Sequence, residues 1–217
     1  PEPSQPMPVP DLSQAKLYGI LDLGYVSLEA APYTAELLLK SGVDVLQLRA
    51  KGRAPTEVET LGGQVLPLAR EAGVPFIIND HPQVAANVGA DGVHVGQDDM
   101  PVAEARGIVG ANKIVGKSTH SLEQAIAAQA EGADYIGFGP LFATPTKPGR
   151  PAIGIQDIVA VHDLVADIPI FCIGGVKLEN LAELVGAGVR RVVIVSGILQ
   201  ADDPNRYILA VKSGLPV

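Results

Sequence analysis

Short apolar runs alternate with longer amphipathic runs along this chain, at a nearly constant interval. The apolar runs have the length and the aliphatic content of buried strands. They lie at 17–21, 43–48, 75–78, 92–95, 113–116, 135–138, 169–173 and 191–195. Helical periodicity predicts helices between them, near 30–40, 56–72, 83–88, 101–108, 121–131, 156–166, 177–186 and 204–212.

Several of these predicted helices carry capping residues at their ends. Ser121 and the Asp203-Pro204 pair stand where helices are expected to begin. Gly73, Gly132 and Gly188 each follow a predicted helix and precede a strand, where a left-handed C-cap is favoured. These signals support the boundaries that the periodicity indicates.

The alternation of strands and helices implies parallel strands joined by right-handed crossovers. Eight such units close into a ring more readily than they form an open sheet, so we predict an α/β fold, a single (βα)8 TIM barrel. An open doubly wound sheet is the alternative, but no G-x-G-x-x-G motif follows the first strand. The prolines among residues 1–10 predict a flexible N-terminal arm over 1–15, which leaves 16–217 as the catalytic barrel domain.

Charge and composition limit the partners of the chain. Its 217 residues carry a formal net charge of −8, which opposes binding to nucleic acid or to anionic lipid. We find neither an apolar stretch of about 18 residues nor an opening signal segment, so we expect no membrane partner and a cytoplasmic location. The one cysteine, Cys172, lies in an apolar run and is expected to be a buried thiol.

Polar and glycine residues follow the predicted strands. In a (βα)8 barrel the chemistry lies at the C-terminal ends of the strands, so these residues are expected to surround one mouth. They are Gln47, Arg49, Lys51, Asn79, Asp80, Gln97, Asp98, Asp99, Ser118, Thr119, His120, Thr144, Thr146, Lys147, Gly174, Gly175, Ser196 and Gly197.

Three cations are expected at this mouth. Period-two alternation puts Gln47 and Arg49 on one face of their strand, directed into the barrel. Arg49 could pair with an acid of the barrel interior as a structural ion pair. However, Lys51 and Lys147 are directed to the same rim, and three cations would repel one another unless an anion joined them.

Two aspartates follow neighbouring strands at equivalent positions. The carboxylates of Asp80 and Asp99 are therefore expected to approach each other, and such oxygen ligands suit Mg²⁺ together with substrate phosphate oxygens. The alternative for either residue is a helix cap or a turn. We expect Asp98, rather than Asp99, to be solvated or to act as a cap.

The ends of the last two strands resemble a phosphate-binding cradle. Gly174-Gly175 and Ser196-Gly197 occupy the positions where backbone N–H groups and a short helix face an anion in such barrels. A tight turn explains a pair of glycines equally well.

The four histidines divide by position. His94 is expected to face inward, either lining a pocket or filling the core, whereas His120 at the rim could act as an acid or base or could orient its loop. His81 and His162 are expected to face the solvent.

Several strings of residues together resemble one family. They are Gln47-Leu48-Arg49, Ile77-Ile78-Asn79-Asp80, the run from Gly89 to Asp99, Gly137-Phe138-Gly139-Pro140, Thr144-Pro145-Thr146-Lys147 and Ile173-Gly174-Gly175. In order and spacing they are similar to thiamine phosphate synthase from about residue 17 to about residue 205.

The resemblance implies a transferase of thiamine biosynthesis. Such an enzyme joins 4-amino-2-methyl-5-hydroxymethylpyrimidine pyrophosphate to 4-methyl-5-(2-hydroxyethyl)thiazole phosphate by a dissociative, Mg²⁺-assisted substitution. It would hold Mg²⁺ with Asp80 and Asp99, the pyrophosphate with Arg49, Lys51, Asn79, Ser118 and Lys147, and the aminopyrimidine with Gln47. The thiazole phosphate would bind at Thr144, Thr146, Gly175, Val195 and Ser196.

The sequence departs from the family pattern at Ala50, His81 and Lys117. Three other functions stay open: a related TenI-type thiazole tautomerase, a non-catalytic sensor of thiamine phosphate, and an isomerase of sugar phosphates. A homo-oligomer is a further expectation, because the last predicted helix is short and closure of the barrel could involve a neighbouring subunit.

Overall fold

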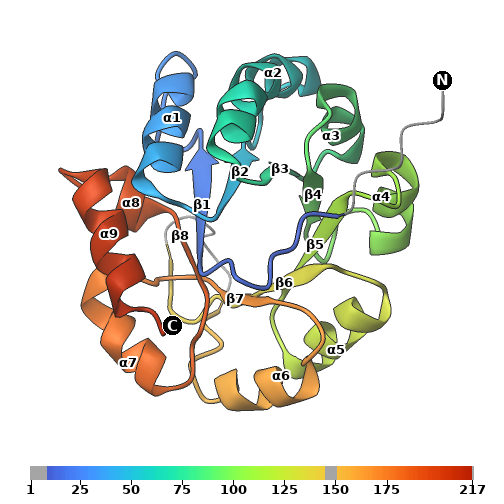
Figure 1. Cartoon of the computed structure of the whole chain (residues 1–217). Helices are drawn as coiled ribbons and strands as arrows, with labels where there is room; N and C mark the ends of the chain where they lie inside the picture. Colours follow the sequence, from blue (N-terminus) through green and yellow to red (C-terminus); the bar gives the residue numbers. More distant parts are fainter. Residues whose placement is uncertain (1–8, 145–150, 217) are drawn as a thin grey trace.

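The computed structural model describes residues 9–144 and 151–216 and shows a closed ring of parallel strands inside a ring of helices (Figure 1). Each strand pairs with its sequence neighbours, and the last strand pairs with the first. The strands are β1 (Leu17–Asp22), β2 (Val45–Arg49), β3 (Phe76–Asn79), β4 (Gly92–Val95), β5 (Ile114–Thr119), β6 (Tyr135–Phe138), β7 (Ile170–Cys172) and β8 (Val192–Ile194). The prediction of a (βα)8 barrel is confirmed.

The helices follow the predicted order, with two differences. The segment predicted as one helix over 177–186 is a 3-10 turn followed by a short helix, and a four-residue helix after β8 was not predicted. The helical elements are α1 (Ala31–Ser41), α2 (Pro55–Ala72), α3 (Pro82–Val88), α4 (Val102–Val109), α5 (Leu122–Ala130), α6 (Ile158–Leu164), η1 (Leu178–Asn180), α7 (Leu181–Gly186), α8 (Ser196–Leu199) and α9 (Pro204–Gly214).

The predicted caps are present. The side chain of Ser121 accepts a hydrogen bond from the backbone N–H of Gln124 at the start of α5, and Asp203 caps α9 in the same way. Gly73, Gly132 and Gly188 all have positive φ, as the left-handed ends of their helices require.

The core has two layers. Aliphatic side chains fill the space between strands and helices, whereas the barrel interior holds larger inward-facing residues such as Tyr18, Tyr135 and Phe171. Gly116 on β5 makes room for one of them: a Cβ added to Gly116 would lie 2.1 Å from the Tyr135 ring. Cys172 is fully buried as predicted, and burial raises the pKa of its thiol to about 12.

The end of the barrel where the strands begin is closed by the segment that precedes β1. Leu12 and Ala15 are buried there, at 5% and 8% exposure, against the interior cluster. Within the arm predicted over 1–15, apolar side chains between the prolines and β1 therefore cover the barrel floor. Residues 1–8 lie outside the described part.

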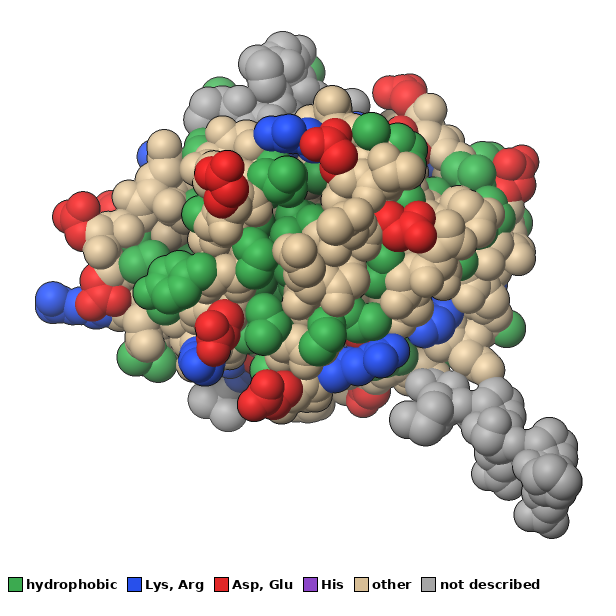
Figure 2. Space-filling view, turned by 90° about the horizontal axis from the view of Figure 1, so that it is seen from above, with side chains coloured by type: hydrophobic (Ala, Val, Ile, Leu, Met, Phe, Trp, Pro, Cys, Tyr) green, Lys and Arg blue, Asp and Glu red, His purple; other side chains and the backbone are tan. Residues whose placement is uncertain are grey.

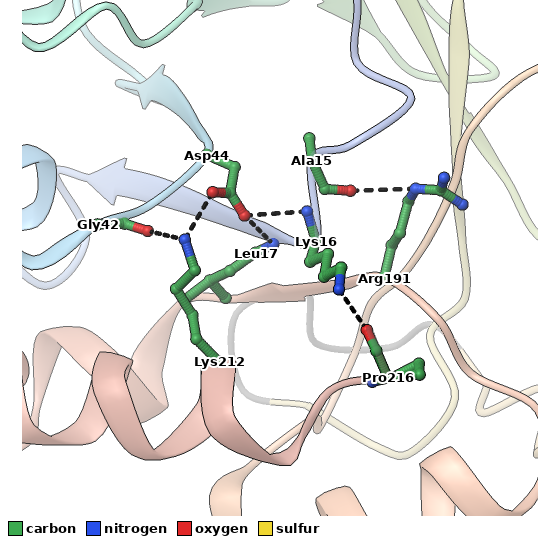
Figure 3. A network of polar contacts seen from close by, with 8 residues as sticks. All are labelled: Ala15, Lys16, Leu17, Gly42, Asp44, Arg191, Lys212 and Pro216. Carbon is green, nitrogen blue, oxygen red and sulfur yellow. Dashed lines mark hydrogen bonds and ion pairs between the residues drawn. The ribbon is translucent and has the colours of Figure 1, made fainter.

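A polar network joins the first strand to the last helix at the same end (Figure 3). Asp44 accepts hydrogen bonds from the backbone N–H groups of Lys16 and Leu17, both at 2.9 Å, and an ion pair from Lys212 of α9 at 2.6 Å. The Lys16 ammonium donates to the backbone oxygen of Pro216. One chain thus closes the barrel without a second subunit. The expectation that closure could involve a neighbouring subunit is therefore wrong, whereas a homo-oligomer stays a prediction.

The arrangement at Asp44 recurs around the barrel floor. Asp91, just before β4, accepts the backbone N–H of Phe76 at 2.8 Å, and Asp134, just before β6, accepts that of Val115 at 2.7 Å. Each aspartate follows a Gly-x pair at the end of a helix. Successive pairs of strands are therefore tied at their starts by the same device.

The surface over α1, α2 and α3 carries acidic and basic side chains scattered among apolar ones (Figure 2). The described side chains drawn on this face do not form a continuous basic patch. No helix within residues 9–144 and 151–216 is long and apolar enough to cross a membrane. His162, expected to face solvent, is instead half-buried, and burial lowers its pKa.

Candidate active site

A cavity opens at the C-terminal ends of the strands, the end opposite the polar network of Figure 3. Its lining comes from strands on all sides of the barrel and from the loops after β6, β7 and β8. Eight of the residues to which the resemblance assigns a ligand line it together: Gln47, Arg49, Asn79, Ser118, Thr144, Gly175, Val195 and Ser196. Lys51, Asp80 and Asp99 lie at neighbouring strand ends, and Thr146 and Lys147 fall outside the described residues.

Arg49 lies at the end of β2 and shares the inward face of that strand with Gln47, as the alternation predicted. Its Nη1 donates to Oδ2 of Asp22 at 2.8 Å, and Asp22 is almost fully buried at the end of β1. The structural ion pair considered from the sequence is therefore present. Nevertheless, the buried Nε of Arg49 has no hydrogen-bond partner among the described residues, so the guanidinium retains capacity for an anion.

Lys51 and Asp80 form an ion pair at the rim. The Lys51 side chain is 54% exposed, whereas that of Asp80 is 14% exposed. The backbone of Asp80 is in the left-handed region, with φ 65°, and its N–H donates to the carbonyl of His94 at 2.8 Å. The Asp80 carboxylate is thus held beside β4 by an unusual backbone conformation and already faces a cation.

Asp99 forms part of a turn after β4. Its Oδ2 accepts the backbone N–H of Gly96 at 2.7 Å, and a Cβ at position 96 would lie 2.7 Å from the same oxygen. Both Asp98 and Asp99 are exposed. The turn role considered as an alternative for Asp99 is therefore observed, and the second carboxylate oxygen is not used in that bond.

A chain of hydrogen bonds crosses the barrel interior below the cavity. Gln47 Nε2 donates to the Tyr18 hydroxyl at 2.8 Å, and the hydroxyls of Tyr18 and Tyr135 lie 2.7 Å apart. The Tyr135 hydroxyl lies 2.8 Å from His94 Nδ1, and His94 Nε2 lies 2.8 Å from the Ser118 hydroxyl. His94 therefore lines the pocket and belongs to the interior at once.

Burial raises the pKa of both tyrosines well above the ordinary value, so both phenols are neutral across the usual pH range. Neither tyrosine was proposed from the sequence, and neither was Asp22. Tyr18 and Tyr135 lie in apolar stretches of their strands, and only partners on other strands reveal their roles, whereas Asp22 ends β1 and has the strand-end position of the other site residues. For the tyrosines, the sequence offers one signal: a side chain that ends in a polar hydroxyl at an inward-facing strand position.

The loop after β7 forms a glycine turn at Gly174 and Gly175. Gly174 and Gly175 have φ of 95° and 68°, and a Cβ on Gly174 would lie 2.3 Å from the side chain of Pro140. The side-chain amide of Asn180 donates to the Gly175 carbonyl at 2.9 Å and fixes the turn. The positive φ and the close packing against the loop after β6 thus both require glycine here.

His120 directly follows β5, and Lys117 lies within that strand. The Nδ1 of His120 contacts the carbonyl of Gly139, and its backbone N–H donates to the Gln124 side chain, so these contacts orient the loop. His120 also lines the cavity. Lys117 lies on the outward face of β5, 6% exposed, and does not line the cavity. The departure from the family pattern at Lys117 therefore leaves the cavity wall unchanged.

A barrel with cationic side chains and a glycine-lined turn around one mouth has the construction of the (βα)8 enzymes that bind phosphorylated small molecules. Comparison with known proteins narrows this class. The family model described as thiamine monophosphate synthase matches residues 17–198. The chain belongs to this family.

Individual relatives agree with this family. Over 189 residues the chain is 46% identical to a thiamine-phosphate synthase of Thermus thermophilus, covering 87% of this chain and 91% of that protein. It is 42% identical to a thiamine-phosphate synthase of Chloroflexus aurantiacus, covering 87% of each. The solved thiamine phosphate pyrophosphorylase from Pyrococcus furiosus superposes with a TM-score of 0.81 at 31% identity, covering 93% of this chain and 98% of that one.

Proposed function

We infer that this chain is a thiamine phosphate synthase, a transferase that joins an aminopyrimidine pyrophosphate to a thiazole phosphate and releases pyrophosphate. The observation that carries this inference is the joint position of Gln47, Arg49, Asn79 and Ser118 on one cavity wall. The cavity belongs to a chain 46% identical to a thiamine-phosphate synthase over most of its length.

Departure of the pyrophosphate is the step that the charged residues serve. The bond between the pyrimidine methylene and the leaving oxygen breaks, and the thiazole nitrogen then supplies the electron pair of the new bond. Arg49 has a buried N–H without a hydrogen-bond partner among the described residues, and the half-exposed Lys51 side chain would exchange Asp80 for a phosphate. These donors, with Asn79, Ser118 and Lys147, stabilise the charge that develops on the leaving group, so a protein nucleophile is not needed.

The thiazole phosphate is placed on the opposite side of the mouth. Thr144, Gly175, Val195 and Ser196 line that wall, and Thr146 belongs to the same set by the family resemblance. Backbone N–H groups at the Gly174-Gly175 turn and at the start of α8 are suited to phosphate oxygens.

Magnesium is proposed at Asp80 and Asp99. The chemistry of the donors fits: both are carboxylates at adjacent strand ends, and Asp80 already attracts the Lys51 ammonium. No group of three or more His, Cys, Asp or Glu side chains within the described residues could hold a metal, so substrate oxygens and water would complete the shell. When bound, the ion would neutralise charge on the leaving pyrophosphate.

The test is incubation with both precursors and Mg²⁺, with detection of thiamine phosphate and released pyrophosphate. Asp80→Ala and Lys147→Ala are each expected to lower kcat/KM about a hundredfold or more while circular dichroism shows a folded barrel. Lys40→Ala is the matched control, because Lys40 forms only an exposed pair with Glu36 on α1. Full activity in either test variant removes that residue from the mechanism.

Removal of the metal separates the synthase from a TenI-type tautomerase. Chelation is expected to abolish pyrophosphate release, and re-addition of Mg²⁺ is expected to restore it. Activity that survives chelation, or tautomerisation of a thiazole without pyrophosphate release, would point to the tautomerase. Binding of both precursors with no product would point to a sensor.

The proposal includes the cellular context. A net charge of −8 supports small-molecule partners rather than nucleic acid or membrane. A cytoplasmic location and assembly into a homo-oligomer remain parts of the proposal.

A further inference from the structure

The hydrogen-bond chain from Gln47 to Ser118 has both of its ends on the cavity wall. Its three middle members, Tyr18, Tyr135 and His94, also border the cavity, but their polar atoms are used within the chain. The hydrogen-bond chain therefore links Gln47 on β2 with Ser118 on β5 through the barrel interior.

The hydrogen-bond chain has a direction of donation, because each neutral hydroxyl has one proton to donate. The Gln47 amide turns its Nε2 toward Tyr18, and in this orientation it can only donate, so the Tyr18 oxygen accepts from it and the Tyr18 proton is directed to Tyr135. If Tyr135 instead donated to Tyr18, the proton of the fully buried Tyr18 would have no acceptor, which is costly. Tyr135 then donates to Nδ1 of His94.

The same direction fixes the far end. A histidine that accepts at Nδ1 carries its proton on Nε2, and that proton is donated to the Ser118 oxygen 2.8 Å away. The Ser118 proton is left for a ligand in the cavity. At the near end, the Gln47 oxygen takes no part in the chain and is left as an acceptor.

We propose that Tyr18 and Tyr135 are positioning residues that hold His94 as its neutral Nε2–H tautomer. Through it they fix Ser118 as a hydrogen-bond donor and Gln47 as an acceptor. The cavity therefore selects a ligand with an acceptor, such as a phosphate oxygen, beside β5 and a donor, such as an exocyclic amine, beside β2. The identity of that ligand rests on the proposed function, whereas the direction of the chain does not.

The first test is ¹⁵N NMR of the histidine side chains in the full-length, ligand-free protein near pH 8. The His94 resonances, assigned with a His94→Gln variant, are expected to show protonation at Nε2 and a bare Nδ1. Protonation at Nδ1, or a doubly protonated ring, overturns the proposal. This spectrum of the unaltered protein decides the matter even if a variant fails to fold.

Tyr135→Phe tests the positioning role itself. It removes the donor to Nδ1, so the His94 signals are expected to move toward a mixture of tautomers. Tyr33→Phe is the matched control: Tyr33 is 71% exposed on α1, and its loss is expected to leave the His94 signals unchanged. Unchanged His94 signals in a folded Tyr135→Phe protein would contradict a positioning role.

The second test compares two pyrophosphate ligands by calorimetry, the 4-aminopyrimidine and its 4-oxo analogue. The unaltered protein is expected to prefer the amine by about tenfold or more, the equivalent of one net hydrogen bond. Tyr18→Phe frees the Gln47 amide to turn over, so the preference is expected to shrink, whereas Tyr33→Phe keeps it. Equal binding of both ligands overturns the inference about ligand selection but leaves the proposed synthase function standing. Binding of neither ligand overturns the proposed function. In that case the NMR result still decides the direction of the hydrogen-bond chain.

Discussion

Asp80 is the one described residue other than glycine with positive φ, and it lies at the rim where magnesium is proposed. A left-handed conformation costs an ordinary residue about 1 kcal/mol, which persists in a native structure when the surroundings hold it there. The His94 carbonyl and the Lys51 side chain provide those surroundings. Position 80 therefore favours function at the expense of stability.

Asp80→Gly is expected to raise the free energy of unfolding by up to about 1 kcal/mol, because glycine adopts positive φ without strain. The same change removes the carboxylate and is expected to abolish synthase activity. Urea unfolding and pyrophosphate release measure the two effects. Asp98→Gly, at an exposed position without positive φ, serves as control and should lower stability slightly. A loss of stability in Asp80→Gly as large as in the control would show that position 80 is not strained.

Individual site residues were predictable only where the strand end itself carries the polar group. Gln47, Arg49 and Ser118 could be placed at the mouth because alternation along one strand decides which face they occupy. Tyr18 could not be given a role, because its partners come from other strands. Asp22 ends β1 and therefore carried the same strand-end signal as Arg49, but it was missed. It is the interior acid that was considered as a partner of Arg49, and it lies beside Arg49 in the pairing of β1 with β2.

At the scale of the element, the glycines have two opposite effects. Gly116 on β5 faces the interior, and a Cβ there would lie 2.1 Å from the Tyr135 ring. Gly63 within α2 has no atoms near its absent side chain. Glycine is therefore required by packing in the strand and is only a weakness in the helix.

Gly116→Ala is expected to lower the free energy of unfolding by about 1–3 kcal/mol, because Tyr135 must shift. Gly63→Ala is expected to raise it by about 0.5–1 kcal/mol, because alanine restricts the unfolded chain and favours helix. Chemical denaturation of the two variants gives both values. Stabilisation by both changes would mean that Tyr135 has room to move.

Elements were predictable to within a few residues because strands and helices differ in hydrophobic period. The segments whose structure the hydrophobic period did not predict share a physical cause. The helix α8 has four residues, too few to show a period, and residues 12–15 follow a run of prolines yet are held by contacts with the barrel floor. Tertiary contacts that local sequence does not express decide both segments.

At the scale of the whole molecule, the candidate active site and the contacts that close the barrel lie at opposite ends of the barrel. The cavity lies where the strands end, and the network around Asp44 lies where they begin (Figure 3). Asp44 has three partners there, two backbone N–H groups and the Lys212 ammonium. Changes at the floor should therefore affect stability without affecting catalysis.

Asp44→Ala is expected to lower the free energy of unfolding by about 1–3 kcal/mol, because two backbone donors and one cation lose their partner. The kcat and KM of the folded fraction are expected to stay the same. Thermal unfolding and steady-state kinetics on one preparation test this. Glu36→Ala, which removes an exposed pair on α1, is the control and should cost less than about 0.5 kcal/mol. A changed KM in Asp44→Ala would show that the two ends communicate.

The aspartates at 44, 91 and 134 have a consequence for the order in which the barrel assembles. Each ties the starts of two strands that are near in sequence, so each tie closes a short loop at little entropic cost. The seam between β8 and β1 instead joins segments from far apart in the chain. We expect this seam to form last and to open first, and native-state hydrogen exchange should find its amides less protected than those between β1 and β2.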